Sequence, residues 1–331
     1  MLLDGQRPDA IAEAARVLQR GDLLGLPTET VYGLAADAGN DDAVRKIYAA
    51  KGRPSDHPLI VHVANVAGVD HFAHSVPDFA RQLMAAFWPG PLTLILPRRE
   101  AVAGVAAGGQ DSVGVRCPAH PVAHAVLLQA QALGVSGVAA PSANLFGRVS
   151  PTTAAHVTNE FGPDLCVIDG GACAVGIEST IVDCTRGAPV LLRPGMLTPE
   201  QLGAVCGMPV LTADAMRSDT PRASGTLASH YAPRAVVKLM SPEALHAALN
   251  ALTHDAARIA VWSRTPMPVA APQCHWRMMP AQAAACAQVL FAQLREFDAL
   301  KVDQIWVEMP PLEPAWDGVR DRLMRAATPN R

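Results

Sequence analysis

The chain has 331 residues, of which 50% are hydrophobic and 17% charged, and its formal net charge is −3. This length suits one large domain or two ordinary ones. Residues 1–196 contain 14 Lys and Arg against 18 Asp and Glu, and residues 197–331 contain 13 against 12. Neither half is a basic arm, so the composition carries no general nucleic-acid-binding signature and any polyanion site must be local.

The seven cysteines are irregularly spaced and form no C-x-x-C pair. This pattern predicts a reduced cytosolic protein with buried thiols, and it excludes a disulfide framework or a zinc ribbon. The first residues include the charged Asp4 and Arg7 and lack the apolar core of a signal peptide. No apolar run approaches the ~20 residues of a membrane span. The sequence therefore predicts a cytoplasmic location and no membrane association.

Helical and strand-like patterns alternate along residues 1–196. Pro8 opens a first helix with apolar residues at helical spacing, and Gly21 ends it. Asp41 is expected to cap the second helix, and Ser150 followed by Pro151 is expected to open the last one. The predicted helices span residues 8–20, 41–50, 77–87, 120–133 and 150–160. The predicted strands span residues 23–26, 59–63, 92–96, 112–116, 137–140, 165–168, 180–183 and 190–192. This alternation, with some strands consecutive, predicts an α/β domain with a mixed sheet.

The pattern changes near residue 194 and restarts near residue 235. A helix at 199–206 precedes residues 207–233, which are rich in Ser, Thr, Pro and Gly and indicate an interdomain linker. The following strands are expected at 235–240, 258–262 and 304–308, and the helices at 242–252, 281–297 and up to Ala326. We therefore predict a catalytic domain at 1–196, a linker at 197–234 and a small α/β domain at 235–331. The absence of G-x-G-x-x-G argues against dinucleotide binding.

A short stretch, Lys51-Gly52-Arg53-Pro54, joins the second helix to the strand that follows it. Gly52 can take backbone angles that other residues avoid, and Pro54 pushes Arg53 into an extended conformation. Because residues two apart in an extended segment point to the same side, Lys51 and Arg53 are expected to present two cations in one direction. That arrangement suits a nucleoside triphosphate. By itself, a K-x-R pair is more often two solvated surface cations.

Other polar residues stand where strands end, the place at which open α/β sheets bind ligands. Thr28, Thr30 and Tyr32 supply neutral donors and acceptors, or serve only a strand-end turn. Arg116 ends an apolar strand and needs a partner, which could equally be a substrate carboxylate or an internal salt bridge. His62 lies on the strand after the Lys51 loop, where a histidine is more often structural.

Several known patterns are missing. The pairs His71/His74 and His120/His124 have metal-like spacing, but no nearby Cys or carboxylate completes a site. There is no Walker A loop and no G-x-S-x-G elbow.

Six strings occur in order along the chain: PTETVYGL at 27–34, KGRP and HPLIVH within 51–62, PSAN at 141–144 with SPT at 150–152, GIESTIVD at 176–183, RPG at 193–195 and HYAP at 230–233. Together they resemble the threonylcarbamoyl-AMP synthase family in its long form. The resemblance implies a YrdC-like twisted mixed sheet with flanking helices, plus a smaller Rossmann-like α/β C-terminal domain. It also implies that the linker carries a lid motif, His230-Tyr231, that folds over the site.

The reaction implied by this resemblance converts L-threonine, bicarbonate or CO₂, and ATP into threonylcarbamoyl-adenylate and pyrophosphate, with Mg²⁺ expected to assist. The product would feed a transferase complex that modifies a tRNA adenosine beside the anticodon, and direct tRNA contact is a further expectation. The implied threonine-binding residues are Thr30, His62, Arg116, Ala140 and Ser179. The implied ATP-binding residues are Lys51, Arg53, His57, Ser112, Ser142, Asn144, Ser150, Arg193, His230 and Tyr231. Lys51 and Arg53 would also be catalytic.

Three positions depart from the family pattern: His57 replaces a common Asn, Ser112 a frequent Thr, and Phe146 a frequent Ser. Three other functions stay open at this point. A double-stranded RNA-binding module would show steep salt dependence, which the net charge of residues 1–196 does not favour. A carbamoyl-transferring hydrogenase-maturation factor would carry zinc-binding Cys pairs, which this chain lacks. An inert regulator would fit the departures at His57 and Phe146 but not the intact strings.

Overall fold

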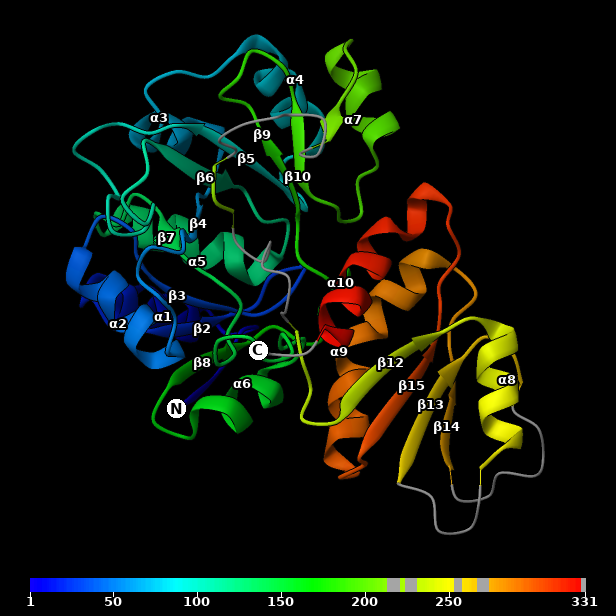
Figure 1. The fold of residues 1–331 in the computed structure, drawn as a ribbon. Helices are drawn as coiled ribbons and strands as arrows, with labels where there is room; N and C mark the ends of the chain where they lie inside the picture. The colour runs from blue at the N-terminus through cyan, green and yellow to red at the C-terminus, as the bar shows by residue number, and fades with distance from the viewer. Residues whose placement is uncertain (213–220, 224–230, 253–257, 267–273, 329–331) are drawn as a thin grey trace. The chain divides into compact units, whose positions relative to one another are not determined.

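The structure is a computed structural model that describes residues 1–212, 221–223, 231–252, 258–266 and 274–328 (Figure 1). The chain divides into two compact units. The first comprises Met1–Phe146 with Ser150–Thr226, and the second comprises Gly147–Val149 with Leu227–Arg331. The boundaries at 1–196, 197–234 and 235–331 stay a sequence-based prediction.

The first unit is built on a mixed sheet that has eleven strands among the described residues, in the order β1-β8-β2-β3-β7-β4-β6-β5-β9-β10-β11. Parallel pairs such as β4 with β6 and β5 with β9 alternate with antiparallel pairs such as β2 with β3 and β5 with β6. The predicted mixed α/β fold is confirmed. The strands are β1 Leu2–Asp4, β2 Leu24–Leu26, β3 Gly33–Asp37, β4 Ile60–His62, β5 Leu92–Pro97, β6 Ser112–Arg116, β7 Val138–Ala139, β8 Cys166–Asp169, β9 Thr180–Asp183, β10 Val190–Arg193 and β11 Leu211–Thr212.

Helices cover both faces of this sheet (Figure 1). On β3, Leu34 and Ala36 belong to one buried apolar cluster and Ala35 belongs to another, because successive side chains of a strand point to opposite faces. The cluster around Ala35 includes residues of α1 and α5, and the other includes residues of α2 and α4. The helices are α1 Pro8–Gln19, α2 Asp41–Lys51, α3 Val69–Phe72, α4 Asp78–Phe87, α5 Pro121–Ala132, α6 Ala154–Phe161 and α7 Pro199–Cys206, with a 3₁₀ turn η1 Val66–Gly68.

Two predicted helix caps were wrong by a few residues. Asn40, not Asp41, caps α2: its side-chain oxygen accepts hydrogen bonds from the backbone N–H groups of Asp42 and Ala43, both at 3.1 Å. Thr153, not Ser150, caps α6 and accepts from the His156 N–H at 3.3 Å. In both cases a neighbouring residue was a good cap by type, and only the backbone path decided which side chain reached the free N–H groups.

Four strands were not predicted: β1, β3, β11 and β14. β1 and β11 are two or three residues long and sit at the edges of the large sheet. β3 reads Gly-Leu-Ala-Ala-Asp, which has neither the alternation nor the β-branched residues of a typical strand. Pairing on both sides, with β2 and β7, holds it in the sheet.

The second unit contains a parallel sheet of four strands among the described residues, in the order β12-β15-β13-β14. The residues Leu245 and Leu249 of its helix α8 pack with Ile259, Val261 and Trp306 of the sheet. This small parallel α/β unit agrees with the predicted Rossmann-like domain. The elements are β12 Val236–Met240, α8 Pro242–Asn250, β13 Ile259–Ser263, β14 Cys274–Met278, α9 Ala283–Ala299, β15 Gln304–Glu308, η3 Pro314–Trp316 and α10 Asp317–Ala327.

Among the described residues, no helix combines the length and the apolar character that crossing a membrane requires.

Candidate functional site

In the first unit, backbone hydrogen bonds join PTETVYGL to PSAN, to SPT and to the residue that precedes GIESTIVD. PTETVYGL joins PSAN where the Leu34 N–H donates to the Pro141 carbonyl at 2.7 Å. It joins SPT where the Tyr32 N–H donates to the Pro151 carbonyl at 2.9 Å. The carbonyl of Glu29 accepts from the Val175 N–H at 2.7 Å, next to GIESTIVD. Segments up to 146 residues apart therefore form one framework, which supports treating them as one site.

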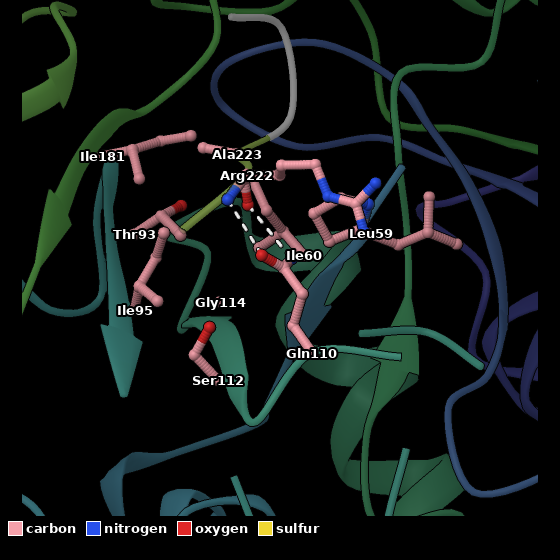
Figure 2. A pocket seen from close by; sticks show the side chains of 11 residues that line it. Leu59, Ile60, Thr93, Ile95, Gln110, Ser112, Gly114, Ile181, Arg222 and Ala223 are labelled. Atoms are coloured by element: carbon pink, nitrogen blue, oxygen red, sulfur yellow. Dashed lines mark hydrogen bonds between the residues drawn. The ribbon is translucent and has the colours of Figure 1, made fainter. Parts of the chain in front are cut away.

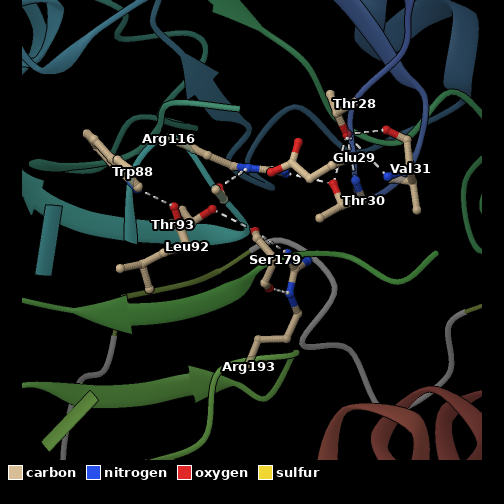
Figure 3. Close-up of polar contacts among 11 residues, drawn as sticks. Thr28, Glu29, Thr30, Val31, Trp88, Leu92, Thr93, Arg116, Ser179 and Arg193 are labelled. Atoms are coloured by element: carbon tan, nitrogen blue, oxygen red, sulfur yellow. Dashed lines mark hydrogen bonds and ion pairs between the residues drawn. The ribbon is translucent and has the colours of Figure 1, made fainter. Parts of the chain in front are cut away.

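Arg116, at the end of β6, is the centre of a buried polar cluster (Figure 3). Its side chain is 4% exposed. Its Nε donates to the Gly90 carbonyl at 3.2 Å, and its Nη1 donates to the Thr30 hydroxyl at 2.8 Å. Its Nη2 lies 2.6 Å from the Glu29 carboxylate. Of the two partners that the sequence left open, the structure contains the internal salt bridge.

The Thr28 hydroxyl fixes the turn that carries Glu29 and Thr30. It donates to the Val31 carbonyl at 2.6 Å and accepts from the N–H groups of Thr30 and Val31, each at 3.2 Å. With its one proton used, it must accept from the Thr30 hydroxyl, 2.8 Å away. The Thr30 oxygen is thereby left to accept from Arg116. The phenol of Tyr32, in contrast, lies against Asp169, Gly170 and Gly171.

His62 stands opposite Arg116 in the paired strands β4 and β6. Burial, reinforced by the positive charge of Arg116, lowers the pKa of His62 to about 3. The imidazole is therefore neutral at physiological pH. Its Nδ1 lies 3.2 Å from the Ile60 carbonyl, which can only accept, so Nδ1 carries the proton and Nε2 is an acceptor.

Ser179 and Arg193 form a second polar group beside Thr93 (Figure 3). The Ser179 hydroxyl lies 2.7 Å from that of Thr93 and accepts from Arg193 Nη2 at 3.1 Å. Arg193 Nε donates to the Ser179 carbonyl at 3.0 Å. A Cβ on Gly195 would lie 2.6 Å from the Thr180 nitrogen, so the glycine of RPG is what lets this turn approach β9.

The loop between Gly90 and β5 connects the two polar groups. Arg116 binds the Gly90 carbonyl, and the Thr180 N–H binds the Pro91 carbonyl at 3.0 Å. The structure thus brings Thr30, His62, Arg116 and Ser179 into one part of the fold. Ala140 belongs to the same framework, since its N–H donates to the Ile60 carbonyl at 3.0 Å.

Lys51 and Arg53 are both buried, at 3% and 7% exposure, which excludes the interpretation of two solvated surface cations. Gly52 between them has the left-handed conformation, with φ at 61°. Lys51 Nζ donates to the Ser142 carbonyl at 2.6 Å and to the Asn144 carbonyl. Arg53 donates to the carbonyls of His57 and Pro58. Burial and the neighbouring Arg53 charge hold the pKa of Lys51 well below its ordinary value.

The two unusual residues at positions 57 and 146 touch each other. The His57 and Phe146 rings have centroids 5.6 Å apart, and the Arg53 guanidinium lies 5.7 Å from the Phe146 ring centre. Partial burial and the Arg53 charge lower the pKa of His57. The backbone N–H of Phe146 donates to the Lys51 carbonyl at 2.8 Å, so the loop after PSAN is attached to the cationic loop.

Ser150 is completely buried and donates to the Glu178 carboxylate at 2.5 Å. The charge of Glu178 acts on Lys51, which places GIESTIVD beside the cationic loop. Lys51, Arg53, Ser142, Asn144, Ser150 and Glu178 are therefore neighbours.

Ser112 lies in a pocket of the first unit that shares Thr93 with the Ser179 group (Figure 2). Apolar side chains such as Leu59 and Ile181 line it, together with Thr93. Arg222, from the predicted linker, lies at this pocket. Its backbone exchanges two hydrogen bonds with the Gln110 side chain, at 2.8 and 3.2 Å, and its guanidinium pairs with Asp56 at 2.6 Å. Part of the linker thus packs on the first unit.

The last two predicted ATP-binding residues fall elsewhere. Tyr231 belongs to the second unit, where its ring lies 5.2 Å from that of Phe291 and 5.6 Å from the Arg322 guanidinium. His230 lies outside the described residues.

Sequence reasoning missed three residues of these clusters: Glu29, Thr93 and Glu178. Glu29 and Glu178 lie inside strings already singled out, so their position was a usable signal. Thr93 lies within an apolar strand and its role depends on Ser179, 86 residues away, so no local pattern could have found it.

Comparisons with known proteins agree with this picture. Residues 16–195 match the Sua5/YciO/YrdC family model, described as "Telomere recombination", and residues 197–328 match one described as "Threonylcarbamoyl-AMP synthase, C-terminal domain". A threonylcarbamoyl-AMP synthase of Bacillus subtilis is 39% identical over 328 residues, covering 96% of this chain and 92% of that protein. One from Pyrococcus abyssi is 46% identical over 229 residues, covering 68% and 66%. The crystal structure of P. abyssi Sua5 complexed with L-threonine has a TM-score of 0.88 at 35% identity, covering 99% of this chain and 97% of that one.

Proposed function

Because the chain belongs to the Sua5/YciO/YrdC family and carries the C-terminal domain of threonylcarbamoyl-AMP synthases, we propose that it makes threonylcarbamoyl-adenylate from L-threonine, bicarbonate or CO₂, and ATP, with release of pyrophosphate. The single observation that carries this proposal is the framework of buried cations. Arg116 and Arg193 on one side, and Lys51 and Arg53 on the other, stand within segments that hydrogen-bond to one another. Two anionic substrates need such a set of cations.

Threonine would bind around Arg116. The planar guanidinium suits the amino acid carboxylate. Neutral His62 offers Nε2 as an acceptor for the threonine hydroxyl, and Thr30 and Ser179 offer hydroxyl groups. Ala140, which is small and buried, would leave room for the side chain. The relative crystallised with L-threonine supports this substrate.

ATP would bind around Lys51 and Arg53, with Ser142, Asn144 and Ser150 nearby, and would extend to Arg193 beside Ser179. The pKa of Lys51 is lowered because burial and the Arg53 charge outweigh the charges of Glu160 and Glu178, so a triphosphate would favour its charged form. The nucleobase would bind at the pocket of Ser112, and His57 directly precedes Pro58 in the lining of that pocket. His230 and Tyr231 would approach from the linker.

Catalysis would rest on alignment. The neutral threonine amine attacks CO₂ and loses a proton to give a carbamate, and with bicarbonate as the source a water molecule also leaves. A carbamate oxygen then attacks the α-phosphorus as the bond to pyrophosphate breaks. No protein nucleophile is needed, and burial raises the pKa of Cys117 to about 11 and that of Cys173 to about 12, so both thiols stay protonated and unreactive. Lys51 and Arg53 would stabilise charge developing on the phosphates.

A Mg²⁺ ion would take most of its ligands from the phosphates and water, as this ion usually does at nucleotide sites. Among the described residues no group of three or more His, Cys, Asp or Glu side chains is placed to hold a metal. Glu178, which is buried beside Ser150 and acts on Lys51 through its charge, would offer the ion a carboxylate oxygen. The ion would neutralise phosphate charge.

The adenylate would then serve a transferase complex that modifies a tRNA adenosine beside the anticodon. A mixed anhydride of this kind hydrolyses readily, so we expect direct transfer to that complex. Direct tRNA contact would show as salt-dependent binding.

The decisive experiment supplies the protein with ATP, bicarbonate and labelled L-threonine. We expect pyrophosphate release that depends on threonine and bicarbonate, together with a labelled adenylate. Pyrophosphate release independent of threonine, or no labelled product, would contradict the proposal.

A further inference from the structure

Glu29 is a buried carboxylate for which the proposed reaction has so far assigned no role. It lies between Thr28 and Thr30 and is 8% exposed. The backbone on both sides is fixed, because its carbonyl accepts from Val175 and the Thr28 hydroxyl holds the turn. Its side chain meets Arg116 (Figure 3). Burying a charge in such a position is costly unless the charge is paired and hydrogen-bonded.

The contact between Glu29 and Arg116 is incomplete as a salt bridge. The Glu29 Oε1 and Arg116 Nη2 atoms are 2.6 Å apart, yet the pair does not have the alignment of a hydrogen bond. Among the described residues, neither Glu29 oxygen has a hydrogen-bond partner. A buried ion pair that serves only stability normally has its remaining lone pairs and protons satisfied. The unpaired carboxylate oxygens of Glu29 therefore point to a ligand that donates hydrogen bonds to them.

The unpaired groups of Glu29 and Arg116 have charges complementary to those of an amino acid. Arg116 presents a cation and Glu29 an anion, side by side and shielded from water. An α-amino acid zwitterion carries a carboxylate and an ammonium on the same carbon. It can place one on each partner, so that the buried charges alternate and the total stays neutral. The second hydrogens of the terminal Arg116 nitrogens are available for the carboxylate.

We propose that Glu29 binds the ammonium group of the amino acid substrate and is the residue that makes this site require an α-amine. The inference rests on the proposed function, because it assumes that Arg116 takes the carboxylate. Glu29 is then the specificity-determining partner of Arg116, and the ion pair holds both side chains in place until the ligand arrives.

The test compares two ligands that differ only at the amine. L-Threonine and (R)-β-hydroxybutyrate share the carboxylate and the hydroxyl, but the second lacks the ammonium. We expect calorimetry on the full chain to show that the unmodified protein prefers threonine by about 10- to 100-fold, the usual worth of a hydrogen bond to a charged group. In Glu29→Gln, which keeps the shape and removes the charge, this preference should shrink to within a few-fold.

Asp183→Asn is the matched control. Asp183 is also fully buried and ion-paired, with Arg186 at 2.9 Å, but it lies at the far end of β9 from Ser179. It should lose stability and keep the preference for threonine. A preference that survives in Glu29→Gln would overturn the inference while leaving the proposed function intact.

The unmodified protein alone keeps the inference falsifiable if Glu29→Gln fails to fold. Equal affinity of that protein for the two ligands would overturn the role of Glu29. No binding of threonine at all would overturn the proposed function, and the inference with it.

Discussion

Arg116 shows how one residue can be held by several partners and still face the proposed threonine ligand. Its Nε and Nη1 atoms have aligned partners in Gly90 and Thr30, which fix the plane of the guanidinium. Only Nη2 meets a charged group, Glu29. The rigid part of the contact therefore orients the cation, while the charged part can be shared with a substrate.

Replacing Arg116 by Ala should raise the KM for threonine by about a hundred-fold or more and leave the affinity for ATP little changed. The reason is that loss of one buried charge partner costs about 3–5 kcal/mol. Threonine titrations of adenylate formation and a separate ATP-binding measurement check this. Equal losses for both substrates would refute the assignment.

A double variant, Arg116→Met with Glu29→Gln, serves as the control for stability. It removes both buried charges, so it should fold better than Arg116→Ala and still fail to bind threonine. If it bound threonine normally, neither charge would belong to the substrate site.

The protonation of His62 gives a prediction on pH. Its folded-state pKa of about 3 lies below the ordinary 6.5, so between these values the unfolded chain binds a proton that the folded chain does not. Its contribution to stability is present above pH 6.5 and is lost as the pH falls. Between pH 7.5 and pH 5, His62→Gln should therefore lose about 2 kcal/mol less of its unfolding free energy than the unmodified protein.

Urea unfolding at the two pH values measures this difference. The other histidines with lowered pKa values, His57 and His120, are present in both proteins and cancel in the comparison. The same pH dependence in both proteins would show that His62 is not buried in its neutral form.

His57 and Phe146 are two departures from the family pattern that contact each other in the structure. Along the sequence they are 89 residues apart and each looks like an isolated loss. In the structure their rings are in contact, and Arg53 lies over Phe146. An aromatic pair of this kind fills the space beside Arg53 and limits its motion. The departures are thus compatible with an intact cationic loop, which weakens the case for an inert regulator.

At the scale of elements, helix α2 places the cationic loop, because Lys51 is its last residue. Its first turn depends on Asn40. Asn40→Ala should lower the unfolding free energy by about 1 kcal/mol, since two N–H groups lose their acceptor. Asp41→Ala should cost only a few tenths, because Asp41 merely places a negative charge in the first turn. Denaturant unfolding of the two variants compares the costs, and equal values would restore Asp41 as the cap.

The start of α6 separates a structural role from a functional one in the same way. Thr153 caps the helix, whereas Ser150, three residues earlier, is bound to Glu178 in the site. Ser150 followed by Pro151 correctly indicated that a helix begins nearby, but it gave the wrong residue as the cap. Because Thr153 accepts the hydrogen bond at the start of the helix, the Ser150 hydroxyl can bind Glu178 instead.

At the scale of the whole molecule, the predicted linker is the segment to which the proposed lid role belongs. Residues 221–223 pack on the first unit through Gln110 and Asp56, while Tyr231 belongs to the second unit. A protease site introduced near Thr220, which lies outside the described residues, would cut this connection in the otherwise complete chain. We expect cutting to abolish adenylate formation and to preserve threonine binding, because Thr30 and Arg116 stay in the first unit.

Adenylate formation and threonine affinity, measured before and after cutting the same preparation, provide the comparison. The uncut protein with the inserted site is the control. A rate that cutting does not change would remove the lid role from the linker.

The sequence by itself determined the class of fold and the segments of the site. Periodic apolar residues placed most helices and strands within a few residues, because burial of one helical face or one strand face leaves a local pattern. The strings around Lys51 and Ser179 are contiguous, so their polar residues could be singled out from the sequence, and their role in binding substrates stays a prediction.

Only the tertiary structure decided which of these groups meet. It paired Arg116 with Glu29, Ser179 with Thr93 and His57 with Phe146, all across long separations. It also held β3 in the sheet against its weak propensity, through neighbours on both sides. Such contacts depend on the path of the backbone through space, and that path is set by the packing of the whole core rather than by any local run of residues.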